Sequence, residues 1–505
     1  MELEFERDTI IGYETVAEAA VCQEETLESI VPDACPDIMR IVDVCGQAAL
    51  SGKQAREGAA AVSGTVRAVV LYQPEEGGGL CRMEMSLPFS CQLEAPGLTE
   101  AGTVLASPRL RCAEARVLNP RKVLLRADLV VEITACQPVE RSVCSGVAEA
   151  QAEEVCQRRF QGEHYQLAAV QEKPFSFSDQ VRLQAGGEAA RLMAARVQPV
   201  CTESKLIGAK LIFKGVVELD LLLQDPEGGL STSHETLPFS QVLEAAGAGE
   251  DADCRLQVEV TDFRCTLNDG RELELTLELL AQVQVRVRRP VALLQDLYST
   301  GFLMETDSEV QQLCRMVDQS MRPQTVRELL ETGELVRSVV DARLALGQVR
   351  QSREGEELVL GVDVWVTVLY LDENEQLQRV SRSIPVSCRL DCPEGGRCSC
   401  LCLCPGEVFA APAAGGIEVR FTVEFHCLIT AASPVPSVTA ARLGEPRGGE
   451  EGQRPSVVLR LAAPGEGLWD IAKAYGTTME QIQQANELEE GVLPTGRMLL
   501  IPSAR

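Results

Sequence analysis

Three similar stretches of sequence decide the fold: VSGTVRAVVLY at residues 62–72, FKGVVELDLLL at residues 213–223 and VLGVDVWVTVLY at residues 359–370. Each contains a glycine that is followed by apolar residues at about every second position. This alternation predicts a β-strand with one buried face, because successive side chains of a strand point to opposite faces. Turn-forming residues (PEEGGG, DPEGG and DENEQ) follow the stretches, so each strand is expected to continue into a hairpin.

These stretches belong to a long internal repeat that two further markers share. The markers are arginines that end short segments at Arg40, Arg191 and Arg337, the glycines Gly64, Gly215 and Gly361, and the tetrapeptides LPFS at Leu87, LPFS at Leu237 and IPVS at Ile384. Every marker recurs after 150 or 151 residues and again after 146 or 147 residues. A solenoid repeat spans only roughly 20 to 50 residues. The longer period therefore indicates three copies of a whole domain.

We predict a mainly β protein with three β-sandwich or barrel-like copies in tandem, which cover residues 1–147, 148–295 and 296–433. Short helices are expected ahead of the hairpin strands, around residues 38–44, 189–195 and 326–335. Proline, glycine and mixed charges in residues 434–456 predict a flexible linker. Residues 457–503 predict a small β-α-α-β module, because Leu468, Ile471 and Tyr475 fall at helical spacing between two strand-like ends.

The overall composition narrows the possible partners and location. The chain has 47 Lys and Arg against 75 Asp and Glu, a formal net charge of −28, which predicts no nucleic-acid partner because phosphate backbones are also negative. No run of about 18 apolar residues occurs, which predicts no membrane insertion. The first residues, MELEFERDTIIGYETV, lack the pattern of an export signal, so we expect a protein of the reducing cytoplasm.

Motifs for catalysis are missing from the sequence. There is no phosphate-binding loop, no dinucleotide-binding fingerprint and no HExxH metal motif. The three histidines, His164, His234 and His426, occur one to a copy but at non-equivalent places, so they predict no common site. We therefore predict a protein that is not an enzyme, with no catalytic residues, no cofactor and no metal.

A cysteine-rich segment, CRLDCPEGGRCSCLCLC, occupies residues 388–404. Its cysteines are Cys388, Cys392, Cys398, Cys400, Cys402 and Cys404. The last four alternate, which on a strand places their side chains about 6.5 to 7 Å apart on one face, whereas zinc binds each of its thiolates at about 2.3 Å. We therefore favour cysteines that pack in the core or on a strand face. A metal site and regulated disulfides remain the alternatives.

PGEGLWDIAKAYGTTMEQIQQAN at residues 464–486 and LPTGRMLLIP at residues 493–502 resemble the LysM module from end to end. LysM modules bind polymers of N-acetylglucosamine through two turns. The resemblance implies a partner-binding or glycan-binding site formed by Gly465, Glu466, Gly467, Leu468, Trp469, Asn486, Glu487 and Leu488. It also implies that Asn486 fixes the turn after the second helix. Trp469 has two interpretations, as a core residue of the module or as an exposed anchor for a protein partner.

Two departures from the LysM pattern favour a protein partner over a glycan. Glu466 replaces the usual aspartate, and Gly467 stands where the family commonly has a Thr or Ser hydroxyl. The second turn also carries Glu487, Glu489 and Glu490. Clustered carboxylates suit a sugar groove poorly, because such a groove normally offers neutral donors and acceptors beside an apolar platform.

The three copies resemble the SPOCS domain of endospore-forming bacteria, most clearly in IVPDACPDIMRIVDV at residues 30–44 and in DLYST at residues 296–300. Several SPOCS copies followed by one LysM module are typical of the SipL-like spore morphogenesis proteins. This resemblance implies a coat-assembly scaffold of the mother-cell cytoplasm, located at the forespore surface. Its LysM module is expected to bind the coat-basement ATPase, stage IV sporulation protein A (SpoIVA). The alternative is a wall protein whose module binds peptidoglycan.

Overall fold

The computed structural model describes most of the chain. The described residues are 2–77, 79–148, 151, 155–183, 191–245, 249, 251–268, 271–355, 357–447, 457–463, 466–488, 496 and 498–502. Within them the protein is built from β-strands, apart from two short helices near the C-terminal end. The predicted mainly β fold class is thus confirmed.

Each copy consists of a long strand, a group of hairpin strands, a shorter strand and a long return strand. Copy 1 contains β1 (Phe5–Ile30), β2 (Ile38–Arg56), β3 (Ala59–Pro74), β4 (Cys81–Glu94), β5 (Thr103–Asn119) and β6 (Lys122–Val147). Copy 2 contains β7 (Val155–Arg182), β8 (Arg191–Ile207), β9 (Lys210–Gln224), β10 (Leu230–Glu244), β11 (Asp253–Asn268) and β12 (Glu272–Ser299). Copy 3 contains β13 (Phe302–Glu331), β14 (Val336–Leu346), β15 (Arg350–Glu354), β16 (Glu357–Asp372), β17 (Leu377–Asp391), β18 (Gly396–Leu403), β19 (Phe409–Ala413) and β20 (Gly416–Pro446).

The strands of each copy form two antiparallel sheets that enclose one aliphatic core. In copy 1, the hairpin sheet β2-β3-β4 packs on the strands β1, β6 and β5, and buried side chains such as Val66 and Leu129 fill the space between them. Copies 2 and 3 repeat this sandwich with their own cores. In copy 3, β14 and β15 together take the place of β2, and β18 and β19 together take the place of β5.

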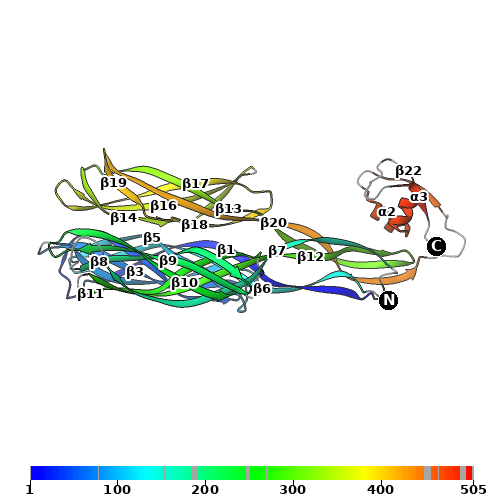
Figure 1. The fold of residues 1–505 in the computed structure, drawn as a ribbon, viewed down its shortest axis with the longest axis horizontal. Helices are drawn as coiled ribbons and strands as arrows, with labels where there is room; N and C mark the ends of the chain where they lie inside the picture. Colours follow the sequence, from blue (N-terminus) through cyan, green and yellow to red (C-terminus); the bar gives the residue numbers. More distant parts are fainter. Residues whose placement is uncertain are drawn as a thin grey trace.

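The copies lie side by side in an elongated molecule, and copy 3 runs along one side of copies 1 and 2 (Figure 1). Tyr13 of β1 pairs with Leu167 of β7, which joins the long strands of copies 1 and 2 into a six-stranded sheet. Beyond the sandwiches, the long strands of all three copies continue together toward one narrow end. We call this part the stalk. Its apolar core combines side chains of every copy, including Val147, Leu297 and Leu443.

The expected linker at residues 434–456 is wrong for residues 434–446, which lie in β20 and pair with β13. Residues 448–456 lie outside the described residues. The prolines that suggested a linker lie in a part of β20 that has a partner strand on one side. The pairing of β18 with β20 ends at Ala431, so Pro434 and Pro436 pair with β13 alone. Proline is tolerated at such an edge because no hydrogen bond is required from its nitrogen.

The three expected helices are also wrong, because strands occupy residues 38–44, 191–195 and 326–331, and residues 332–335 form a non-helical connection between β13 and β14. In two of them β-bulges explain the misleading pattern. The register of β2 shifts between Ile38 and Arg40 and again between Ile41 and Asp43, and that of β8 shifts between Leu192 and Ala194. A bulge inserts an extra residue and breaks the alternation of buried positions, so the apolar spacing imitates that of a helix.

The glycine and LPFS markers are partners across the hairpin sheet. Gly64 lies opposite Phe89 and Gly215 lies opposite Phe239. A Cβ atom on Gly64 would lie 2.3 Å from Phe89 Cζ and 2.4 Å from the carbonyl oxygen of Ala49. The phenylalanine ring thus covers the glycine and fills the space that a side chain would otherwise take.

In copy 3 a different pair of residues fills this position in the hairpin sheet. Gly361 is therefore not the structural equivalent of Gly64 that the sequence markers suggest. Val362, not Gly361, lies at the position of Gly64, because it faces Val386 of the IPVS tetrapeptide. Two valines replace the pair of a glycine and a phenylalanine. Gly361 is one residue out of register, and a Cβ atom there would meet no atom within 4 Å.

We predict that Gly64→Ala destabilises the protein, whereas Gly361→Ala is tolerated. The new methyl group at residue 64 must displace the Phe89 ring or the β2 backbone, and such overpacking costs about 1 to 3 kcal/mol. Urea unfolding of the two variants measures the difference. Equal unfolding midpoints for both variants would show that the ring does not confine Gly64.

The three hairpin sheets meet at an apolar cluster with approximate threefold symmetry. Leu71, Leu222 and Leu369 occupy equivalent positions and lie together in this cluster. The residues opposite them on the neighbouring strands are Asp43, Ala194 and Asp341, and the residues two positions further are Cys45, Arg196 and Arg343. The copies therefore present two equivalent rings of residues to one another.

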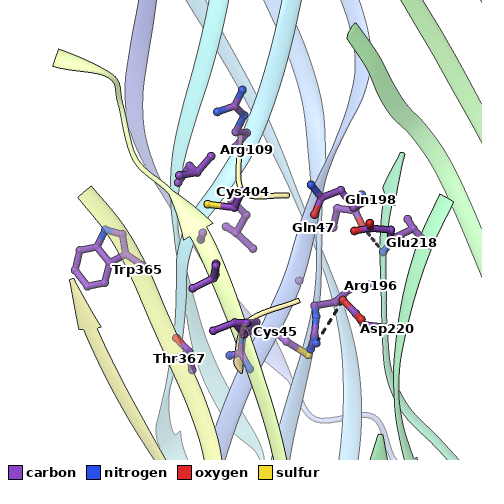
Figure 2. A pocket seen from close by; sticks show the side chains of 18 of the residues that line it. Cys45, Gln47, Arg109, Arg196, Gln198, Glu218, Asp220, Trp365, Thr367 and Cys404 are labelled. Carbon is purple, nitrogen blue, oxygen red and sulfur yellow. Dashed lines mark hydrogen bonds and ion pairs between the residues drawn. The ribbon is translucent and has the colours of Figure 1, made fainter. Parts of the chain in front are cut away.

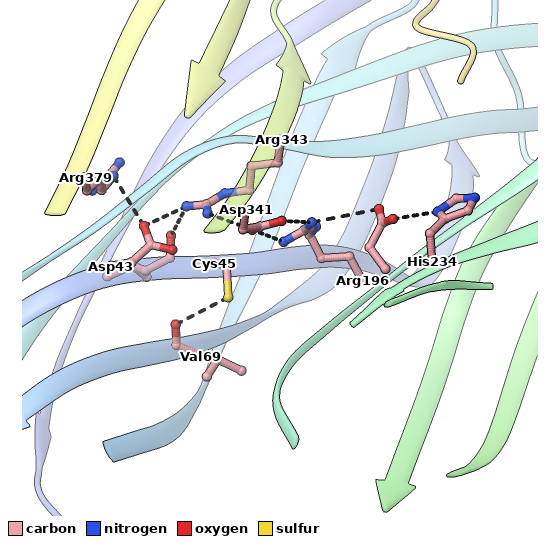
Figure 3. A network of polar contacts seen from close by, with 10 residues as sticks. Asp43, Cys45, Val69, Arg196, His234, Asp341, Arg343 and Arg379 are labelled. Carbon is pink, nitrogen blue, oxygen red and sulfur yellow. Dashed lines mark hydrogen bonds and ion pairs between the residues drawn. The ribbon is translucent and has the colours of Figure 1, made fainter. Parts of the chain in front are cut away.

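Ion pairs connect these two rings between copies (Figure 3). Arg343 of copy 3 donates a hydrogen bond to Asp43 of copy 1 at 2.7 Å. Arg196 of copy 2 forms two hydrogen bonds to Asp341 of copy 3, at 2.8 and 2.9 Å. At the third place, Ala194 and Cys45 are apolar and both lie in the central cluster. Burial opposes ionisation of Asp341, but Arg196 and Arg343 outweigh it and lower the pKa of this carboxyl below its usual value.

We predict that Asp341→Asn destabilises the protein far more than Asp363→Asn. Asp363 makes an equally bidentate contact with Arg350, at 2.6 and 3.0 Å, but Arg350 is 61 % exposed and Arg196 only 18 %. Breaking a buried pair costs about 3 to 5 kcal/mol, since it leaves a buried charge alone. An exposed pair contributes about 0 to 1 kcal/mol.

The pH dependence of unfolding checks the same pair. Because the pKa of Asp341 is lowered in the folded protein, its stabilising effect is present above the unfolded pKa of 3.8 and is lost as the pH falls through the lower folded pKa. The difference in unfolding free energy between the wild type and Asp341→Asn should shrink on acidification below about pH 4. A difference that stays constant between pH 7 and pH 3 would contradict an ionised Asp341.

Candidate functional site

The C-terminal module contains β21 (Val457–Leu461), α2 (Leu468–Tyr475), α3 (Met479–Asn486) and β22 (Met498–Pro502). The two strands pair antiparallel, from Val457 opposite Pro502 to Leu461 opposite Met498. Local sequence explains both helix boundaries. Gly476 ends α2 with a φ of 63°, a left-handed conformation that glycine adopts easily, and the Thr478 hydroxyl accepts a hydrogen bond from Gln481 N at the start of α3.

The predicted site residues fall at the ends of the two helices. Glu466, Gly467, Leu468 and Trp469 lie at the start of α2, and Asn486, Glu487 and Leu488 lie at the end of α3. Gly465 lies outside the described residues. Leu468 and Trp469 are buried, whereas Glu487 is exposed.

Asn486 joins α3 to β22, in keeping with the role that the LysM resemblance implies. Its side-chain amide donates hydrogen bonds to the carbonyl oxygens of Ile482 and Leu500, at 2.7 and 2.6 Å, and its Oδ1 accepts one from Leu500 N at 2.7 Å. These three bonds occupy the side chain. Asn486 therefore shapes the site without being free to bind a partner.

Trp469 connects the module to the stalk. The residue is 7 % exposed, and its Nε1 donates a hydrogen bond of 2.8 Å to Asp296 Oδ2 near the end of β12. Its ring packs edge-on against Tyr298, with 4.9 Å between the ring centroids. In this arrangement Trp469 is buried between the module and β12, so it is part of an intramolecular interface.

Further polar contacts hold the module at the same place. Lys473 Nζ lies 2.6 Å from Asp296 Oδ1. The Tyr298 hydroxyl donates a hydrogen bond of 2.8 Å to the carbonyl oxygen of Thr477, and burial raises the pKa of Tyr298, which keeps the hydroxyl protonated as a donor. Arg447, which follows β20, donates a hydrogen bond from Nη1 to the carbonyl oxygen of Lys473 at 3.4 Å. The DLYST segment therefore forms the platform on which the module docks.

In the first of the two expected recognition turns, Glu466 and Gly467 form hydrogen bonds within the module. Glu466 is paired with Arg460 at 2.5 Å, and its other oxygen accepts a hydrogen bond of 3.2 Å from Ala463 N. Gly467 N donates to Asp470 Oδ2 at 3.2 Å. Because these groups already have partners, a glycan would have to replace existing hydrogen bonds to use them.

The module carries an exposed aliphatic face that the sequence analysis did not identify. The face consists of Val457, Leu459 and Leu461 on β21 and Met498 and Leu500 on β22, which are 42 to 65 % exposed. The opposite face of the same strands packs into the module core through Val458, Leu499 and Ile501. The sequence held a sign of this face, because apolar residues of VVLRL and MLLIP occupy both faces of the strands and do not alternate with polar ones. Contiguous exposed apolar surface of this kind marks interaction sites.

A second candidate is a cavity of about 700 Å³ where the three copies meet (Figure 2). Several polar groups at its wall already have partners, although Arg111 Nε, Arg343 Nη1 and Arg379 Nε are buried without a hydrogen bond. Arg109 donates to Glu132 at 3.0 Å, Gln47 accepts a hydrogen bond of 3.3 Å from Val197 N, and Arg196 is held by Asp341. The cavity thus belongs to the contacts that join the copies.

Cysteines of the segment at residues 388–404 pack as strand and core residues. Cys402 is fully buried in the core of copy 3, and Cys398, Cys400 and Cys404 pack against that core.

The histidines lie on three separate strands, each with its own partner. His164 accepts a hydrogen bond from Cys314 N, His234 contacts Asp220, and His426 contacts Glu424.

Within the described residues, no helix is both long enough and apolar enough to cross a membrane.

Comparison with known families identifies the parts of the chain. Residues 37–118 and 188–268 match the family described as SipL, SPOCS domain, and residues 463–502 match the LysM domain. No curated protein and no solved structure matches the chain. The chain therefore contains two SPOCS-domain segments, one in copy 1 and one in copy 2, and a C-terminal LysM domain, as the two resemblances predict. SPOCS and LysM are families of non-catalytic domains.

The two segments that match the SPOCS domain correspond to the same strands in copies 1 and 2. They cover β2 to β5 in copy 1 and β8 to β11 in copy 2, that is, the hairpin sheet and the strand that follows it. Copy 3 has the same order of strands, although its sheets contain the split strands and the valine pair described above.

We predict that Asp296→Ala releases Trp469 from the stalk, because it removes the acceptor of both Trp469 and Lys473. The experiment uses a Trp365→Phe background, in which Trp469 is the sole tryptophan of the chain. Loss of a partner for a buried donor costs about 1 to 3 kcal/mol. The fluorescence of Trp469 should shift to longer wavelength and become easier to quench with acrylamide.

Asp307→Ala is the matched control, since Asp307 is an exposed carboxylate on the neighbouring strand β13. It should leave the emission unchanged. If Asp296→Ala behaves like this control, Asp296 does not hold the module.

Proposed function

We propose that this protein is a non-enzymatic scaffold of spore coat assembly, whose LysM module binds the coat-basement ATPase SpoIVA through the exposed aliphatic face. The family description SipL supports a sporulation role for the SPOCS copies. The observation that carries the choice of a protein partner is the aliphatic face itself. Its location is proposed to be the mother-cell cytoplasm, at the forespore surface.

The chemistry of the module favours a protein surface over a sugar chain. Burying a leucine side chain contributes about 1.5 to 3 kcal/mol, and the face offers five exposed aliphatic residues on two paired strands. A sugar offers many hydroxyls, which require free polar partners. In the described part of the first turn, the Glu466 carboxylate and Gly467 N are instead bonded within the module.

Docking on the stalk gives the module a defined orientation. Asp296 and Tyr298 hold α2 against the stalk, while the aliphatic face belongs to the strands and remains exposed. A fixed orientation lowers the entropy lost when a partner binds. Several weak contacts on a polymeric coat layer could add to this one, because the three copies form one body with the module.

Peptidoglycan binding is the second candidate. It is favoured by the match of residues 463–502 to the LysM domain, whose members include peptidoglycan-binding modules. A wall protein of this kind would use the two turns at the helix ends and would not need the aliphatic face.

We predict that the double variant Leu459→Glu and Leu500→Glu binds SpoIVA at least tenfold more weakly than the wild type. Both side chains are exposed, so the variant should fold normally, and two carboxylates in an apolar interface lose the free energy of burial. Co-sedimentation of the full chain with SpoIVA polymers measures binding. A parallel experiment with insoluble peptidoglycan tests the second candidate.

Leu335→Glu is the control for a new charge at an exposed leucine, because Leu335 is 71 % exposed in copy 3, outside the module. It should bind like the wild type. Retention on peptidoglycan without binding to SpoIVA would overturn the proposal, and so would unchanged SpoIVA binding by the double variant.

A further inference from the structure

Two cysteines of copy 3 lie directly opposite each other on neighbouring strands. Cys400 of β18 is in register with Cys427 of β20, and their Sγ atoms are 3.7 Å apart. Among the twenty cysteines, no other pair is directly opposed in the registers of the described strands. Opposed residues of antiparallel strands have Cα atoms about 4.5 to 5.5 Å apart, which lies within the range that a disulfide spans.

The surroundings of Cys427 favour its thiolate. Hydrogen bonds from Cys398 and Cys400 lower the pKa of Cys427 below its usual value, and electrostatic interactions with His426 and Arg322 lower it further, although burial opposes this effect. The pKa of Cys400 is raised, so this neighbour stays a protonated donor. A thiolate beside a thiol is the arrangement from which oxidation to a disulfide proceeds.

A small oxidant has access to the pair. Cys398 and Cys400 are half-buried, and both line a second cavity, of about 1270 Å³, together with Glu18 and Gln351. Cys427 is 2 % exposed and lies beside Cys400, which lines the cavity. Because so little of Cys427 is exposed, the oxidant that reaches its sulfur must be small.

We propose that Cys400 and Cys427 are a redox modification site, which hydrogen peroxide converts to a disulfide between β18 and β20. The Cys427 thiolate attacks one oxygen of the peroxide; the S–O bond forms, the O–O bond breaks and hydroxide leaves. The Cys400 sulfur then attacks the Cys427 sulfenic acid; the S–S bond forms, the S–O bond breaks, and water leaves with the thiol proton. In total, two thiols are oxidised and one peroxide is reduced to two waters.

The disulfide would act on the contact between copies. Ser399, next to Cys400, bonds to Glu18 of copy 1 and to Arg255 of copy 2. Arg109 of copy 1 also approaches the carbonyl oxygen of Cys402, at 3.5 Å. Strand β18, like β14, therefore touches both other copies, and the disulfide would link it covalently to β20.

The test treats the full chain with hydrogen peroxide, blocks the remaining thiols and analyses tryptic peptides without reduction. Cleavage after Arg397, Arg420 and Arg442 gives the peptides 398–420 and 421–442. We expect these two peptides to be joined, with a loss of two hydrogen atoms, and fragment ions to place the link at Cys400 and Cys427. Dithiothreitol should separate them.

Cys400→Ser should abolish the link, and Cys404→Ser, at another half-buried cysteine of the same peptide, is the matched control that should keep it. The oxidised wild type should also unfold at a higher urea concentration than oxidised Cys400→Ser, since the link is absent there. A link from Cys427 to Cys398, persistence of the link in Cys400→Ser, or unlinked peptides after oxidation would each overturn the proposal.

Discussion

Two buried ion pairs at the place where the copies meet constrain the whole molecule. Asp43 and Asp341 lie beside an apolar cluster, and burying a carboxylate there costs several kcal/mol unless an opposite charge compensates it in good geometry. Arg343 and Arg196 supply that charge from a different copy in each case. The copies can therefore satisfy these groups only in one mutual arrangement. The apolar third place, Ala194 with Cys45, breaks the symmetry and distinguishes the copies from one another.

Copy 3 preserves the topology but changes the packing inside it. Val362 and Val386 replace the pairs of glycine and phenylalanine in copies 1 and 2, and in every copy these side chains pack into the core. Its cysteines occupy the edge where copies 1 and 2 have other side chains. The family match covers copies 1 and 2, which accords with this divergence: the strand order of copy 3 survives while the residues that a sequence pattern recognises have changed.

The module and the stalk depend on each other in a similar way. Asp296 and Tyr298 lie at the end of the last long strand of copy 2, and they bind the module through Trp469 and Lys473 of α2 and through Thr477. Because Trp469 is buried in this interface, its ring is not exposed for binding a partner. The aliphatic face on β21 and β22 is left as the prominent apolar surface of the module.

The sequence by itself determined the three copies, their hairpin strands and the β-α-α-β module, because alternation, turn residues and helical spacing are local patterns. It also indicated that Cys398, Cys400 and Cys402 lie on a strand. Only the tertiary structure decided that bulged strands replace the expected helices, that Pro434 lies at a strand edge, and that Trp469 meets Asp296. These features depend on register and packing between residues far apart in the chain, such as the 173 positions between Asp296 and Trp469, and no local pattern encodes such contacts.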